Sequence, residues 1–120
     1  MAEVRNADGI EPYITKDKAE IREIFHPRNS EIKSMGIAEA TVPVGESTKY
    51  HYHNVSDEIY YILQGIGILE MEGKVKEVRE KDCVFIPVRH RHKIKNIGKV
   101  PLKILCISCP PYSHDGTVLV

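Results

Sequence analysis

Three residues near the middle of the chain have the chemistry and the spacing of metal ligands. His51 and His53 stand two positions apart, and Glu58 follows after four intervening residues. Side chains two positions apart on an extended strand point to the same face, so the two imidazoles are expected side by side. The polar residues 54–57 can turn the chain so that Glu58 faces them. Two imidazole nitrogens and one carboxylate oxygen on one face suit a divalent transition metal.

A fourth ligand is expected from a second segment, residues 87–92, which Asn96 follows. This segment contains two histidines, His90 and His92. The alternative to a metal site is that all of these histidines are ordinary core or surface residues, because a His-x-His pair alone carries little information.

Residues 45–65 resemble the first motif of the cupin superfamily. That motif consists of a glycine, five residues, His-x-His, three or four residues, a glutamate, six residues and a glycine. The chain matches it at every fixed position. The second cupin motif is matched with two departures. Pro87, His92 and Asn96 have its spacing, whereas Lys81 and Arg89 stand where glycines are usual. Glycine adopts positive φ freely and other residues lose roughly 1 kcal/mol or more there, so the departures concern the geometry of two turns.

The resemblance implies a ligand set of three imidazoles and one carboxylate, namely His51, His53, Glu58 and His92. Such a set accepts Fe(II), Mn(II), Co(II), Ni(II), Zn(II) or Cu(II), so a divalent transition metal is the expected cofactor. Four protein ligands leave positions of a five- or six-coordinate ion open to water or substrate, as a catalytic site requires.

Two further residues are candidates for catalysis. Tyr60 has the same parity as Glu58, so its hydroxyl is expected in the same cavity, either bound to a ligand or satisfied locally as in a core tyrosine. His90 has the parity of His92 and is either a proton shuttle or an exposed loop residue.

The cysteines are expected to be structural. Cys106 and Cys109 have the C-x-x-C spacing, but they lie at the end of an apolar strand, where residues three apart face opposite ways. Buried or partly buried thiols are therefore favoured over a redox pair, and Cys83 is also expected to be buried. An odd number of three cysteines fits a reducing cytoplasm.

Composition excludes several classes of partner. The 120 residues carry no net charge and no basic run, which argues against nucleic acid or an anionic membrane. No stretch of 18 apolar residues and no secretory core are present, so a cytoplasmic protein without a transmembrane helix is expected.

The rest of the sequence predicts many short strands separated by turns, at residues 19–25, 35–44, 58–63, 66–71, 74–79, 83–86, 91–95 and 102–109. This pattern is typical of an all-β sandwich or barrel. The resemblance sharpens it to one cupin domain over residues 1–120, a double-stranded β-helix or jelly-roll barrel with the metal inside its mouth. Residues 1–18 are expected to form a loosely ordered N-terminal arm and residues 110–120 a C-terminal tail.

Two of the predicted strands are apolar on both faces. In residues 58–63 and 102–107 the apolar side chains occupy both parities, although a sheet that is covered on one side alternates with polar residues. Either the N-terminal segment or a second subunit is expected to cover the outer face, and we favour a homodimer.

The fold does not name the reaction. The resemblance implies a metal-binding protein that acts on a small organic molecule, with an oxygenase-type enzyme such as a dioxygenase as the first hypothesis. The alternatives are a non-catalytic domain that binds or senses a sugar or metabolite, a metal-stabilised structural domain, and a sugar-phosphate isomerase. The isomerase follows from small prokaryotic cupins that are called mannose-6-phosphate isomerase-like, but the chain has no glycine-rich phosphate loop.

Overall fold

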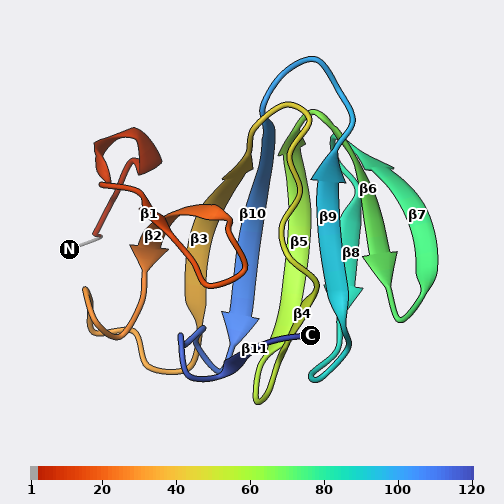
Figure 1. The fold of residues 1–120 in the computed structure, drawn as a ribbon. Coiled ribbons are helices and arrows are strands. Elements are labelled where there is room, and N and C mark those ends of the chain that lie inside the picture. Colours follow the sequence, from red (N-terminus) through yellow and green to blue (C-terminus); the bar gives the residue numbers. More distant parts are fainter. Residues whose placement is uncertain (1–2) are drawn as a thin grey trace.

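A computed structural model describes residues 3–120 as two antiparallel β-sheets (Figure 1). The first sheet has the strand order β1-β2-β3-β10-β5-β8, and the second has the order β11-β4-β9-β6-β7. The predicted all-β jelly-roll class is confirmed. The strands are β1 (Tyr13–Ile14), β2 (Glu20–Phe25), β3 (Gly36–Val42), β4 (His51–His53), β5 (Asp57–Gln64), β6 (Ile66–Met71), β7 (Lys74–Arg79), β8 (Cys83–Ile86), β9 (His92–Asn96), β10 (Leu102–Cys109) and β11 (Thr117–Leu119).

Both ends of the chain contain short strands. The N-terminal segment, expected to be a loosely ordered arm over residues 1–18, contains a 3-10 helix, η1 (Ala7–Gly9), and β1, which pairs with β2. Residues 1 and 2 lie outside the described residues. The expected tail over residues 110–120 contains β11, which pairs with β4. Strands of two or three residues have almost no sequence pattern, and distant partners hold these two in place.

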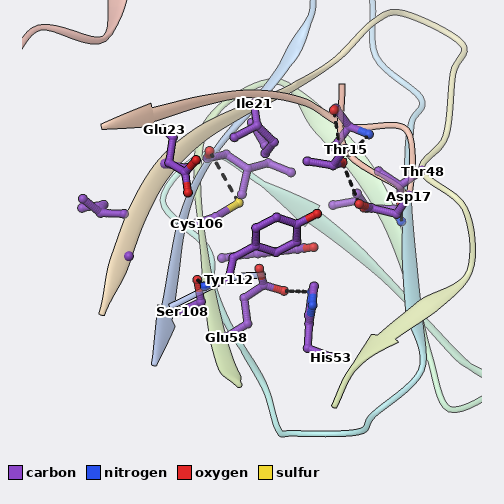
Figure 2. Close-up of a pocket in the computed structure, with 18 of the residues that line it drawn as sticks. Thr15, Asp17, Ile21, Glu23, Thr48, His53, Glu58, Cys106, Ser108 and Tyr112 are labelled. Carbon is purple, nitrogen blue, oxygen red and sulfur yellow. Dashed lines mark hydrogen bonds and ion pairs between the residues drawn. The ribbon is translucent and has the colours of Figure 1, made fainter. Parts of the chain in front are cut away.

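The space between the sheets has two different ends. An apolar core fills one end with side chains from both sheets that are at most 8% exposed: Ala40, Val42, Tyr60, Ile62, Leu69, Val78, Ile86, Ile94, Leu102, Ile104 and Cys106. Towards the other end the core adjoins a cavity of about 50 Å³, which also has polar side chains such as Asp17, His53 and Glu58 in its wall (Figure 2).

The two strands with apolar residues on both faces behave as their parity predicts. On β5, Tyr60 and Ile62 are buried, whereas Tyr61 is 36% and Leu63 is 41% exposed. On β10, Leu102 is fully buried and the side chains of the other parity are only partly covered. On the outer face of the first sheet, β5 and β8 therefore expose apolar side chains to solvent in the single chain.

The prediction that Cys83 is buried is wrong. Ile86 lies opposite Glu58 on the neighbouring strand and points into the molecule, with only 1% of its surface exposed. Because side chains alternate along β8, Phe85 and Cys83 take the outer face, and both are exposed. The short apolar run gave no sign of which parity faces inward.

The second cupin motif keeps its turn geometry despite the missing glycines. Lys81 has φ of 73° and Arg89 has φ of 66°, so both adopt the left-handed conformation that glycine would adopt more easily. Asn96 is fully buried, and its side-chain amide donates to the carbonyls of Val42 and Val100, at 2.9 Å each. The motif asparagine therefore ties β9 to β3 and to the loop before β10.

No helix in the described part of the chain is long and apolar enough to cross a membrane.

Candidate metal centre

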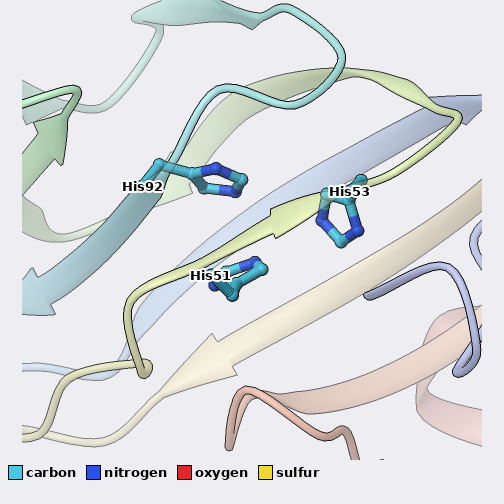
Figure 3. A group of neighbouring side chains, drawn as sticks. All are labelled: His51, His53 and His92. Carbon is cyan, nitrogen blue, oxygen red and sulfur yellow. The ribbon is translucent and has the colours of Figure 1, made fainter. Parts of the chain in front are cut away.

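Two neighbouring strands bring three histidines together (Figure 3). His51 and His53 lie on one face of β4, and His51 is the direct cross-strand partner of His92 on β9. One ring nitrogen from each residue can be chosen such that all three lie within 4.8 Å of one another, and all three side chains are buried. The predicted grouping of these three histidines is confirmed.

The Nδ1 atoms of two of these rings are hydrogen-bonded to backbone carbonyls. The Nδ1 atom of His51 lies 2.7 Å from the carbonyl oxygen of Lys49, and the Nδ1 atom of His92 lies 2.9 Å from that of His90. A carbonyl oxygen only accepts hydrogen bonds, so each neutral ring carries its proton on Nδ1. Each Nε2 atom therefore presents a lone pair, which is the form that binds a metal.

The third ring is oriented by a hydroxyl group. The Nδ1 atom of His53 lies 3.2 Å from Oγ1 of Thr117, and this hydroxyl donates to the carbonyl of Ser113 at 3.0 Å. Because the hydroxyl proton is used there, Oγ1 accepts from the Nδ1–H group of His53. In their neutral forms, all three histidines therefore have the same tautomer, with the proton on Nδ1 and the lone pair on Nε2.

Glu58 reaches this group from the opposite sheet. Its carboxylate is buried, and Oε1 lies 3.2 Å from Nε2 of His53 and 3.5 Å from Nε2 of His92 (Figure 2). Ligand atoms that lie about 2.1 Å from an ion and subtend a right angle are about 3 Å apart, so these separations suit neighbouring ligands.

Two of these atoms lack a hydrogen-bond partner. Among the described residues, only Oε1 of Glu58 and Nε2 of His92 are buried side-chain polar atoms without one. An unpaired buried polar atom is costly, by about 1–3 kcal/mol or more when charged. A divalent cation between them would satisfy both, so the residues fit a metal.

The environment sets the charge of each group. Burial lowers the pKa of His51. Burial alone would raise the pKa of Glu58, but His53 and His92 outweigh it and hold this pKa below its usual value, so the carboxylate is an anion at neutral pH. Burial also acts to lower the pKa of His53, but the Glu58 carboxylate outweighs it and raises that pKa.

Asp17, which sequence reasoning did not single out, also lies at this centre. It lies in the turn between β1 and β2 and is only 6% exposed. Its Oδ2 atom lies 3.4 Å from Nε2 of His51. Asp17 lies far from both motifs in the sequence, so no spacing could have indicated this contact.

The two candidate catalytic residues have different surroundings. Tyr60 lines the cavity, and its ring centroid lies 5.9 Å from that of His92. Burial, reinforced by the charge of Glu58, raises the pKa of Tyr60 well above its usual value, so the hydroxyl keeps its proton and can donate it. The His90 ring is exposed and contacts the carbonyl of Val88 at 3.3 Å, outside the cavity wall. Its role at the site is carried by its backbone carbonyl, which orients His92.

The cavity wall is largely apolar around these ionisable groups. Its apolar members include Ala19, Ile21, Ala38, Val42 and Ile104. Glu23 also lines it, but its carboxylate accepts from the Tyr13 hydroxyl at 2.9 Å and pairs with Arg28 at 2.5 Å. None of the described residues in the wall is a lysine or an arginine.

The cysteines take no part in a disulfide. Cys106 is buried in the cavity wall, where burial raises the pKa of its thiol well above the usual value, and Cys109 is exposed. The expected burial is therefore correct for Cys106 and wrong for Cys109, because the two residues lie three apart on the strand and face opposite ways.

Comparison with known proteins identifies the family. Residues 38–108 match the family model described as "Cupin domain", so the chain belongs to the cupin family. It is 50% identical over 113 residues to "Uncharacterized protein MJ1618" of Methanocaldococcus jannaschii, a match that covers 94% of this chain and 90% of that one.

Two comparisons with Thermotoga maritima involve proteins named for oxalate. The chain is 29% identical over 92 residues to an "Oxalate-binding protein" of this organism, covering 77% of this chain and 76% of that one. The crystal structure of a "predicted oxalate decarboxylase" from the same organism superposes with a TM-score of 0.79 at 27% identity, covering 90% of this chain and 99% of the other.

Proposed function

We propose that this protein is a metal-dependent cupin that acts on a small organic molecule, with His51, His53, Glu58 and His92 as ligands of a divalent transition metal. The observation that carries the proposal is the convergence of Nε2 lone pairs on a carboxylate whose Oε1 atom has no hydrogen-bond partner. Lone pairs and an anion repel one another unless a cation lies between them. The cavity beside them gives a small molecule access to that cation.

The reaction class that we propose first is an oxygenase-type oxidation. Iron or manganese, when bound, would supply Lewis-acid activation and electron transfer. The chain would contribute the Tyr60 hydroxyl as a hydrogen-bond donor to the substrate, and apolar side chains that keep water out.

Oxygen consumption tests this proposal directly. The protein is loaded with Fe(II) or Mn(II) and offered enediols, flavonols and thiols in an oxygen-electrode assay. We expect turnover with one substrate class and none with Glu58→Gln loaded in the same way. Full metal occupancy without oxygen uptake for any substrate would rule out the oxygenase.

The second candidate is a binding protein without turnover. The relative named as oxalate-binding favours it. Calorimetric titration of the metal-loaded protein with oxalate, followed by recovery of the ligand, separates the candidates. Unchanged ligand after tight binding indicates a binding protein, whereas a reaction product indicates an enzyme.

A sugar-phosphate isomerase is the third candidate, and the cavity favours it least. A phosphate dianion needs cationic side chains or a nest of backbone N–H groups, whereas the charged wall residues described here are the carboxylates of Asp17, Glu23 and Glu58.

We also propose that the chain forms a homodimer through the outer face of the first sheet. Ile59 and Phe85 are direct partners on β5 and β8, and Tyr61 and Leu63 continue the same face. A contiguous exposed apolar face of this kind marks an interaction surface. Light scattering is expected to give twice the chain mass for the native protein and a single chain mass for Phe85→Glu. A monomeric native protein would overturn the proposal.

A further inference from the structure

We propose that Asp17 is a fifth protein ligand of the metal centre, an inference that rests on the proposed function above. Glu58 contacts two of the three histidines, and Asp17 contacts the third. Glu58 Oε1 lies 3.2 and 3.5 Å from the Nε2 atoms of two histidines, and Asp17 Oδ2 lies 3.4 Å from Nε2 of the third, His51. All three separations are near the roughly 3 Å expected between neighbouring ligand atoms on one ion.

A hydrogen bond fixes one oxygen of the Asp17 carboxylate and leaves the other available to a metal ion. Thr15 Oγ1 donates to Oδ1 of Asp17 at 2.7 Å, which leaves Oδ2 to face His51 (Figure 2). Thr15 and Asp17 are both buried, each with 6% of its surface exposed. A neighbouring hydroxyl that fixes a ligating carboxylate is the arrangement usual around metal ligands.

Hydrogen bonds join the turn that carries Asp17 to the segment just before β4 and to β11, which pairs with β4. The carbonyl of Asp17 accepts from the backbone N–H of Lys49 at 2.7 Å, and Lys16 Nζ donates to the carbonyl of Thr117 at 2.8 Å. Lys18 adopts φ of 71°, a left-handed conformation that costs a non-glycine residue about 1–2 kcal/mol. Such strain is retained where the surroundings require one geometry.

Electrostatics supports a cation between Asp17 and His51. The proton on Nδ1 of His51 is committed to the Lys49 carbonyl, so the neutral ring turns a lone pair toward an anionic oxygen. That contact is repulsive without a positive charge between the two atoms. Three neutral imidazoles, two carboxylates and one divalent cation sum to zero charge. A buried centre is expected to be neutral because an uncompensated buried charge is costly.

The alternative is that Asp17 only anchors the N-terminal turn through Thr15 and Lys49. Metal-binding measurements separate the two roles, because an anchor affects folding of the metal-free protein and leaves the coordination of the ion unchanged. We therefore choose Asp17→Asn, which keeps the shape and removes the charge, with Asp115→Asn as the matched control at an exposed carboxylate.

The first measurement is Co(II) affinity by chelator competition, together with the visible absorption spectrum of the bound ion. Asp17→Asn is expected to bind Co(II) about 10–100-fold more weakly than the native protein, and with an altered spectrum. Asp115→Asn is expected to match the native protein in both respects. Native affinity and an unchanged spectrum in a folded Asp17→Asn protein would overturn the inference.

The second measurement needs no variant. In water enriched in ¹⁷O, the EPR lines of bound Mn(II) broaden with the number of coordinated waters. Five protein ligands leave a six-coordinate ion one water, whereas four leave two. One water is the expected result, and two waters would refute Asp17 as a ligand. If the native protein binds no divalent metal at all, the proposed function fails, which is distinguishable from a native protein that binds metal with two waters.

Discussion

The apolar core (the core end) and the cavity with the histidines (the cavity end) are built on the same strands, but their side chains find partners in different ways. On β5, Glu58 faces the cavity and Ile62, four residues later on the same face, lies in the apolar core. On β9, His92 belongs to the group of three histidines, and Ile94, two residues later on the same face, lies in the apolar core. The core end needs only its own packing, because apolar side chains are satisfied by one another. The cavity end has two buried polar atoms without a hydrogen-bond partner, Oε1 of Glu58 and Nε2 of His92.

This contrast separates the origin of stability from the origin of function. Burial of apolar area at the core end holds the two sheets together, and a buried Leu or Ile stabilises the fold by about 1.5–3 kcal/mol relative to an exposed one. The cavity end instead holds two carboxylates and three histidines close together, which is an arrangement suited to binding rather than to packing. The next three predictions test whether the two ends are independent.

The largest effect is expected from His92→Ala. The change removes a proposed ligand that is fully buried and lacks a partner at Nε2, so metal affinity is expected to fall by at least about 100-fold. His90→Ala, two positions away on the exposed loop, is the matched control and is expected to retain native affinity. Isothermal titration with Zn(II) or Co(II) measures both. Equal losses for the two variants would mean that the loop, rather than the ligand, determines binding.

The opposite result is expected at the core end. Leu102→Ala leaves a cavity at a fully buried position and is expected to lower the free energy of unfolding by about 2–5 kcal/mol. Metal affinity is expected to stay within about threefold of the native value, since distant sites are nearly additive. Leu105→Ala, on the partly covered face of the same strand, is expected to lose less stability. Urea unfolding gives the stabilities, and a collapse of metal binding in Leu102→Ala would show that the ends are coupled.

Metal binding at the cavity end is expected to affect the stability of the whole fold. A ligand that binds only the folded chain stabilises it by about 2.7 kcal/mol at a free concentration of 100 times its Kd. Treatment with a chelator is therefore expected to lower the Tm of the native protein, and Zn(II), Co(II) or Mn(II) is expected to restore it. The Tm of His92→Ala is expected not to respond to the same treatment. If the chelator leaves the Tm of the native protein unchanged, the centre holds no metal.

Sequence reasoning succeeded where geometry is local. His51 and His53 share a face because strand side chains alternate, and the known spacing to Glu58 and His92 completed the group. Most strand bounds followed from the turn residues between them for the same reason. The metal-binding role of these four residues stays a prediction.

Reasoning from the sequence failed where placement depends on distant parts of the chain. Asp17 reaches His51 only because β1 and β2 form a turn that is held by Lys49 and Thr117. Cys83 is exposed because the inward parity of β8 is set by the pairing of Ile86 with Glu58. Neither contact has a periodicity or spacing that the sequence displays.

The smallest effect is expected where the chain departs from the cupin pattern. Lys81 has φ of 73°, and its side chain is exposed, so Lys81→Gly removes left-handed strain without removing packing. Relief of the strain, about 1–2 kcal/mol, is partly offset by the larger entropy that glycine loses on folding. The free energy of unfolding of the variant is therefore expected to rise by roughly 0.5 kcal/mol. Arg89→Gly is expected to be stabilised less, because it also loses the hydrogen bond from Nε of Arg89 to the carbonyl of Asn54 at 3.3 Å.

The reverse change provides the control for this prediction. Gly45 has φ of 78° with open space around the position of a Cβ atom, so Gly45→Ala is expected to lose about 1 kcal/mol through backbone strain alone. Urea midpoints measured with the metal-free protein isolate these effects from metal binding. If Lys81→Gly is less stable than the native protein while Gly45→Ala behaves as expected, the lysine makes a favourable contact that outweighs its strain. The missing glycine of the second motif would then be a stabilising feature of this chain.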